Sequence, residues 1–165
     1  MKRQSEIALI PVTLIVNNKK YELFVKPNET LLDILRNYLY LKSVKASCWS
    51  GDCGVCTVLL EEIPVKSCLI LAHEVNLKKI TTVEGLGGET LTELQQAFIQ
   101  NGAVQCGFCT PAFILMGHYL LKKNKSLSQL EVKRSLNGII CRCTGYKQII
   151  DSILTAYYDK LNELT

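Results

Sequence analysis

The spacing of apolar residues changes from a strand-like to a helix-like pattern about halfway along the chain. In the first half, strands are predicted at 12–16, 20–25, 57–60, 64–67 and 79–83. Asn17-Asn18 separates the first two apolar runs, which predicts a β-hairpin with a tight turn. Thr30 and Asp33 form a capping-box pattern that opens a short amphipathic helix at 31–36.

Helical spacing dominates the second half, where capping residues and glycines delimit four helices. Thr90 with Glu93 opens a helix to Gln100 that Asn101-Gly102 ends; Thr110-Pro111 opens a helix to about 121; Ser128 with Glu131 opens a helix that ends at Asn137-Gly138; and a last helix spans about 146–161. Glycines at 85, 87 and 88 mark a boundary. We therefore predict an α+β fold, with an N-terminal β-grasp domain at 1–84 and a C-terminal four-helix domain at 85–165.

Composition excludes several classes of protein. The 165 residues are 48% hydrophobic and 21% charged, which is typical of a folded globular chain. No apolar run approaches the roughly 18 residues of a membrane-spanning helix, so we predict no membrane insertion. The net charge of +4 is spread along the chain without a basic stripe, so we predict no binding to nucleic acid.

The compartment bears on the chemistry of the eight cysteines. Lys2-Arg3 precedes an apolar run at 7–16, as in a short signal peptide, but Glu6 and Pro11 interrupt the pattern and no cleavage motif follows. We therefore expect a cytoplasmic protein. In a reducing compartment, eight cysteines in one chain indicate metal binding and not disulfides.

The first four cysteines predict an iron–sulfur site. They are Cys48, Cys53, Cys56 and Cys68, spaced C-x4-C-x2-C-x11-C. The first three follow the plant-type [2Fe–2S] spacing. Gly51 and Gly54 let the backbone fold closely around such an anion, with N–H groups pointing inward. Zinc is the alternative, although structural zinc sites usually pair their ligands as two short knuckles.

The other four cysteines are compatible with either zinc or a cluster by spacing alone. They are Cys106, Cys109, Cys141 and Cys143, spaced C-x2-C-x31-C-x-C. Cys109 comes just before the helix that begins at Thr110-Pro111, and Cys143 comes just before the helix that begins near Tyr146. Two helix N-termini would then face one thiolate group, which favours a cluster and would raise its reduction potential.

Three segments around these cysteines resemble a known family. They are 48–58 (CWSGDCGVCTV), 102–111 (GAVQCGFCTP) and 141–146 (CRCTGY). Together they resemble the small iron–sulfur subunit of the molybdenum hydroxylases, the xanthine dehydrogenase and aldehyde oxidase family, and the resemblance spans about 12–153. It implies a plant-ferredoxin-like β-grasp domain with one [2Fe–2S] cluster and a four-helix domain with the other.

The resemblance also implies partners and a direction of electron flow. The partners are a large molybdopterin-binding subunit and an FAD-binding subunit. Single electrons would pass from the molybdenum cofactor through the helical-domain cluster, then through the β-grasp cluster, to FAD. In this family the glutamine before the first cysteine of the helical domain, here Gln105, and the last cysteine, here Cys143, approach the pterin.

Two other functions remain compatible with the residues: a stand-alone ferredoxin-type carrier, and a zinc or redox-sensing binding module. The sequence contains neither a Walker A loop nor a G-x-G-x-x-G motif for FAD or NAD. It also contains no motif for a catalytic acid or base. We therefore predict the electron-transfer subunit of an oxidoreductase complex, not catalytic by itself. The resemblance leaves the substrate open among purines, aldehydes, nicotinate-like heteroaromatics and carbon monoxide, with a purine as the commonest guess.

Overall fold

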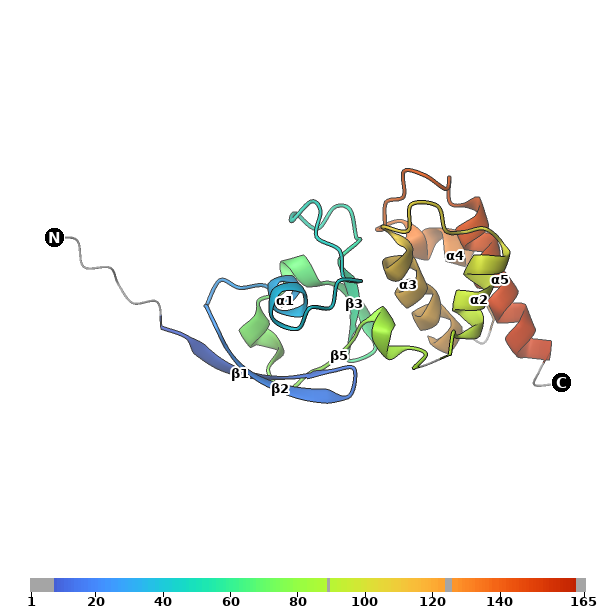
Figure 1. The fold of residues 1–165 in the computed structure, drawn as a ribbon. Helices are drawn as coiled ribbons and strands as arrows, with labels where there is room; N and C mark the ends of the chain where they lie inside the picture. Colours follow the sequence, from blue (N-terminus) through green and yellow to red (C-terminus); the bar gives the residue numbers. More distant parts are fainter. Residues whose placement is uncertain (1–7, 89, 124–125, 163–165) are drawn as a thin grey trace.

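The computed structural model describes residues 8–88, 90–123 and 126–162. A sheet with short helical segments lies at one end of the molecule, and longer helices lie at the other (Figure 1). The strands are β1 Ile10–Val16, β2 Lys19–Val25, β3 Thr57–Leu60, β4 Ile63–Lys66 and β5 Lys79–Thr81. The helices are α1 Leu31–Asp33, α2 Glu93–Gln100, α3 Thr110–Lys123, α4 Gln129–Leu136 and α5 Lys147–Asn162. Short segments are η1 Ile34–Tyr38, η2 Ser67–Leu69, η3 Ala72–Val75 and η4 Val83–Gly85.

The five strands form one mixed sheet in the order β2-β1-β5-β3-β4. β1 pairs antiparallel with β2 and parallel with β5, whereas β3 is antiparallel to both β4 and β5. Asn17 and Asn18 adopt positive φ angles of 49° and 64°, as a two-residue turn of type I′ requires, which confirms the predicted hairpin. The mixed sheet and the helices that follow it agree with the coarse α+β prediction.

The helix predicted at 31–36 begins where its capping box places it. The Thr30 hydroxyl accepts a hydrogen bond from the Asp33 N–H at 3.2 Å, and the Asp33 carboxylate accepts one from the Thr30 N–H at 2.9 Å. After Asp33 the helix widens into the π-helical segment η1, which ends at Tyr38. Leu31 and Leu32 are buried in one core cluster with Val12, Leu14 and Val16 of β1, and this cluster is the core of this half.

The first predicted helix of the second half begins two residues later than expected, so the Thr90–Glu93 capping box is wrong. Thr92 caps α2, and its hydroxyl accepts a hydrogen bond from the Gln95 N–H at 3.3 Å. Thr90 instead belongs to the glycine turn, because its N–H donates to the Gly87 carbonyl at 3.3 Å.

The other helix boundaries lie close to their predictions. The capping box of Ser128 and Glu131 at α4 is confirmed. α3 begins at Thr110, so Cys109 takes the capping position predicted for Thr110, and the Cys109 carbonyl accepts a hydrogen bond from the Phe113 N–H at 3.3 Å.

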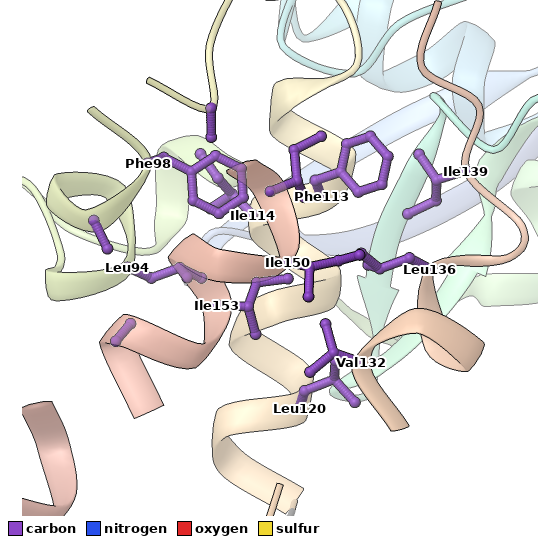
Figure 2. Close-up of a cluster of buried hydrophobic side chains, with 14 of the residues drawn as sticks. Leu94, Phe98, Phe113, Ile114, Leu120, Val132, Leu136, Ile139, Ile150 and Ile153 are labelled. Carbon is purple, nitrogen blue, oxygen red and sulfur yellow. The ribbon is translucent and has the colours of Figure 1, made fainter. Parts of the chain in front are cut away.

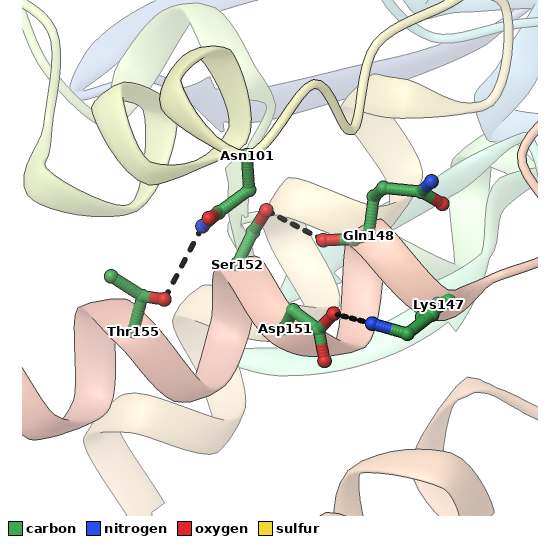
Figure 3. A network of polar contacts seen from close by, with 6 residues as sticks. All are labelled: Asn101, Lys147, Gln148, Asp151, Ser152 and Thr155. Carbon is green, nitrogen blue, oxygen red and sulfur yellow. Dashed lines mark hydrogen bonds and ion pairs between the residues drawn. The ribbon is translucent and has the colours of Figure 1, made fainter.

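Helices α2 to α5 enclose a second apolar core (Figure 2). Phe98, Phe113 and Ile153 are buried at its centre. Outside this core, the Asn101 side-chain amide donates to the Thr155 hydroxyl at 3.2 Å, which ties the end of α2 to α5 (Figure 3). The Ser152 hydroxyl on α5 donates to the Gln148 carbonyl at 2.7 Å, and Lys147 pairs with Asp151.

The two halves pack against each other through α3, which contacts β3 and the edge strand β4 of the sheet (Figure 1). Val55 belongs to the cysteine loop of the first half, yet its side chain is buried in the core of the helices. The Lys122 ammonium on α3 pairs with the Glu62 carboxylate in the β3–β4 turn at 3.1 Å. The division into domains at residues 84 and 85 stays a prediction.

Phe113 provides a test of the helical core. Its ring is fully buried and meets the Tyr146 ring edge-on, with centroids 6.0 Å apart. Phe113→Ala should therefore lower the free energy of unfolding by about 3–5 kcal/mol, measured by urea denaturation. Phe24→Ala is the matched control, because Phe24 is exposed on β2 and its loss should change stability by less than about 0.5 kcal/mol. Equal effects of the two changes would contradict this core.

Candidate iron–sulfur sites

The first four cysteines come together beside the sheet. Cys48, Cys53 and Cys56 lie in the loop between η1 and β3, and Cys68 lies in η2, directly after β4. The sulfurs of Cys56 and Cys68 are 3.5 Å apart and buried. The Cys48 sulfur accepts hydrogen bonds from the backbone N–H groups of Ser50 at 3.5 Å and of Cys53 at 3.4 Å.

Glycines allow this loop to turn back on itself. Gly51 and Gly54 have φ angles of 83° and 67°, in the left-handed region that other residues rarely adopt. A Cβ on Gly51 would approach the Leu69 side chain to 2.5 Å, and a Cβ on Gly54 would collide with the Gly138 carbonyl. The loop therefore has room only for backbone at these positions, as a close-fitting anion site requires.

The thiols of this group differ in how readily they ionise. Hydrogen bonds from the N–H groups of Cys53 and Ser50 lower the pKa of Cys48 to about 6. Burial, and the neighbouring Cys56 thiol, raise the pKa of Cys68 to about 11. Buried thiolates placed side by side need a cation between them, because each disfavours the ionisation of the other.

The second four cysteines come together at the start of α3 and in the loop that leads to α5. Cys109 lies beside Cys141, and Cys106 lies beside Cys143. Cys106 and Cys143 are exposed, whereas Cys109 is buried. Cys109 directly precedes α3, as predicted, so its sulfur lies beside a helix N-terminus.

Thr144 stabilises the ionised form of Cys141. Its hydroxyl donates to the Cys141 sulfur at 3.1 Å, and its backbone N–H donates at 3.4 Å. Burial would raise the pKa of Cys141, but these hydrogen bonds outweigh burial and lower it. By contrast, burial and the Cys141 thiol raise the pKa of Cys109 to about 12, and the Cys106 thiol raises the pKa of Cys143.

The sulfurs meet as pairs. Within the described ranges, no three histidine, cysteine or acidic side chains are arranged to hold one metal ion. A [2Fe–2S] cluster has four thiolate ligands shared between two irons. The pairs Cys56–Cys68, Cys109–Cys141 and Cys106–Cys143 fit that distribution, and the inward N–H groups fit the negative charge of such a cluster.

A backbone hydrogen bond connects the two sites. The Ile140 N–H donates to the Cys53 carbonyl at 2.9 Å, and Ile140 is bonded directly to Cys141. One ligand candidate of the first group is therefore linked to one of the second by a few covalent bonds and a single hydrogen bond.

Comparison with known proteins shows which protein families and chains this one resembles. A model of the 2Fe-2S iron-sulfur cluster binding domain matches residues 14–80, and a model of a [2Fe-2S] binding domain matches residues 82–154. The nicotine 6-hydroxylase small subunit of Paenarthrobacter nicotinovorans is 41% identical over 147 residues, which cover 89% of each chain. The xanthine dehydrogenase iron-sulfur-binding subunit of Escherichia coli O157:H7 is 41% identical over 148 residues, 88% of this chain and 92% of the relative. The chain belongs to the family of small iron–sulfur subunits of molybdenum hydroxylases.

Solved structures show the same fold for this iron–sulfur subunit. It superposes on the aldehyde oxidoreductase of Desulfovibrio desulfuricans with a TM-score of 0.88 and 43% identity, over 93% of this chain and 17% of that larger chain. It superposes on quinoline 2-oxidoreductase of Pseudomonas putida 86 with a TM-score of 0.87 and 38% identity, over 94% of this chain and 98% of the other. No helix in the described part of the iron–sulfur subunit is long and apolar enough to cross a bilayer.

The structure adds residues that the sequence did not single out. The sequence places Thr144 in a motif and Tyr146 near the start of a helix, and the structure adds that the Tyr146 hydroxyl accepts a hydrogen bond from the Cys141 N–H at 3.0 Å. A hydroxyl residue three positions after a cysteine was the available signal for Thr144. Gln105 is exposed beside the exposed Cys106, and its approach to a pterin stays a prediction.

Two cavities differ in their relation to these sites. A largely apolar cavity of about 580 Å³ lies beside both cysteine loops, with Asp52, Ile140 and Tyr146 in its lining. A more polar cavity of about 640 Å³ lies between the sheet and α3, where His118 and Tyr119 line it. Burial lowers the pKa of His118 there. No residue of either cysteine loop lines this polar cavity, so it is separate from the iron–sulfur sites.

Thr144→Val should make the site at Cys141 harder to reduce, because the change removes one hydrogen bond to the sulfur and keeps the side-chain volume. Loss of a hydrogen bond to a charged group costs about 1.5 kcal/mol, so the midpoint potential should fall by up to about 65 mV. A redox titration followed by electron paramagnetic resonance (EPR) measures it. Thr144→Ser keeps the hydroxyl and should titrate like the wild type; an unchanged potential in Thr144→Val would refute this role.

Proposed function

We propose that this chain relays electrons within a molybdopterin-dependent hydroxylase, together with a large molybdopterin-binding subunit and an FAD-binding subunit. A plant-ferredoxin-like β-grasp domain at 1–84 and a four-helix domain at 85–165 would each hold one [2Fe–2S] cluster. The ligands of the first would be Cys48, Cys53, Cys56 and Cys68, and those of the second Cys106, Cys109, Cys141 and Cys143.

The observation that carries this proposal is the pairing of thiols in two groups joined by the Ile140–Cys53 hydrogen bond. When bound, the two clusters supply one-electron transfer, so that the two electrons released by a hydroxylation can leave the molybdenum cofactor singly and reach FAD. The chain itself contributes position and electrostatics. Relatives that carry the names of hydroxylase and dehydrogenase subunits support this reading.

The surroundings of the sulfurs suit ligands that must carry negative charge. The N–H groups of Ser50 and Cys53 donate hydrogen bonds to the Cys48 sulfur, and the Thr144 hydroxyl donates one to the Cys141 sulfur. At Cys109, the N-terminus of α3 adds a partial positive charge. Each donor favours the charged sulfur over the neutral thiol, and each favours an added electron for the same reason.

Exposure supports the second cysteine group as the one that meets the molybdenum-bearing partner. Cys106 and Cys143 are exposed, and Gln105 is exposed beside them. Phe108 and Val104, in the same loop, expose 44% and 43% of their surface, an apolar area suited to a protein interface. We therefore place Gln105 and Cys143 against the pterin of the large subunit.

Eight free thiols suit the reducing cytoplasm.

The pairing of the sulfurs and their spacing support this function over its alternatives. A structural zinc site usually pairs its ligands as two short knuckles, whereas Cys48, Cys53 and Cys56 follow the C-x4-C-x2-C spacing of a plant-type cluster. A stand-alone ferredoxin needs only the first group. The second group, with its exposed cysteines, instead fits a chain that stays docked on a partner, and co-purification with a molybdenum-containing large chain tests this.

Cys106→Ser tests the relay in the purified complex. Loss of one ligand should remove the EPR signal of the helical-domain cluster and stop substrate-driven reduction of FAD, while the other reduced signal persists. The measurements are EPR of the dithionite-reduced complex and the absorbance of FAD after substrate is added.

Cys68→Ser is the matched variant for the other group, and it should remove the other signal. Undiminished reduction of FAD in Cys106→Ser would overturn the relay. Loss of both signals in either variant would show that the two halves do not bind their clusters independently.

A further inference from the structure

Lys66 places a positive charge against the loop that carries the first cysteine group. It is the last residue of β4, two positions before Cys68, and its side chain is half-buried. Its ammonium group donates a hydrogen bond to the Gly51 carbonyl, inside the loop between Cys48 and Cys53. The Gly51 backbone in turn lies beside the Cys68 thiol. Lys66 therefore contacts the backbone that surrounds this group of sulfurs.

The same ammonium group also faces the second cysteine loop. A Cβ built on Gly138 would lie 3.8 Å from the Lys66 Nζ and 3.9 Å from its Cε. Gly138 is three residues before Cys141, and Ile140 between them is hydrogen-bonded to Cys53. The ammonium thus lies between the two loops at the point where they meet.

No carboxylate neutralises this charge in the described ranges, where Lys66 forms no ion pair. Asp52, the acidic residue next to Gly51, accepts a hydrogen bond from the Ser50 hydroxyl. Lys133 borders the same loops, because it lines the cavity that Asp52 and Gly138 share, but its side chain is exposed. Solvent screens an exposed charge much more strongly than a half-buried one.

We infer that the positive charge of Lys66 favours the reduced form of both clusters, and that its effect on the β-grasp cluster is the larger. This inference rests on the proposed function. Four thiolates, two ferric ions and two sulfides carry a net charge of about −2. One electron reduces one of the two irons, no proton is taken up, and the charge becomes more negative by one. A cation held on the Gly51 peptide favours that added charge.

The position of Lys66 also gives its effect a direction. Its direct hydrogen bond is to Gly51, in the first loop, whereas it only faces Gly138 across a van der Waals gap. The reduced form of the β-grasp cluster therefore gains more than that of the helical-domain cluster. This difference favours electrons moving toward the cluster that is proposed to serve FAD.

The test is an EPR-monitored redox titration of the full-length chain loaded with its clusters, with dithionite as the reductant. Lys66→Gln should shift the equilibrium of the β-grasp cluster about tenfold toward the oxidised form, which is about 59 mV for a one-electron couple. The shift of the other cluster should be smaller. Lys66→Arg, which keeps the charge, and Lys133→Gln, which removes an exposed charge nearby, should both titrate like the wild type.

Several results would overturn the role of Lys66. One is an unchanged potential in cluster-loaded Lys66→Gln. Another is an equal shift in Lys66→Arg, which would indicate a requirement for lysine geometry and not for charge. If neither Lys66→Gln nor Lys66→Met takes up iron, Lys66 is a structural residue of the loop. A wild-type chain that binds no cluster would overturn the proposed function, and this inference with it.

Discussion

The close approach of two backbone loops, at Gly54 and at Gly138, is the constraint on which both sites depend. No side chain fits between them, because a Cβ on Gly54 would collide with the Gly138 carbonyl. The approach lets the Cys53 carbonyl accept the Ile140 N–H and brings Val55 into the core of the helices. Two cysteine groups that are far apart in the sequence are thereby held next to each other by rigid backbone and not by flexible side chains.

Around this contact, hydrogen-bond donors and one ammonium group offset the negative charge of the thiolates. Thiolates placed side by side repel each other, and burial increases the cost, as the raised pKa values of Cys68 and Cys109 show. Backbone N–H groups at Cys48, the Thr144 hydroxyl at Cys141 and the Lys66 ammonium at Gly51 act in the opposite direction. The same donors that make thiolates available as ligands also favour electron uptake, so binding and potential have one physical origin.

Local signals predicted local features well. The Asn17-Asn18 turn and the capping boxes at Thr30 and Ser128 lie where their residue types place them, because each depends on neighbours within four positions. The grouping of cysteines by spacing also agrees with the contacts between them, although their role as ligands stays a proposal. The predicted start of α2 was wrong because Thr90 forms part of a glycine turn and does not cap the helix. Contacts between distant segments, such as Lys66 with Gly51 and Gly138, leave no periodic signal in the sequence and required the fold.

The central claim is that each group of four thiolates binds one [2Fe–2S] cluster. Iron, acid-labile sulfide and zinc, measured together per full-length chain purified without oxygen, test it most directly. The account predicts about four irons and about four sulfides per chain, without zinc. About two zinc ions per chain, with no sulfide, would contradict it.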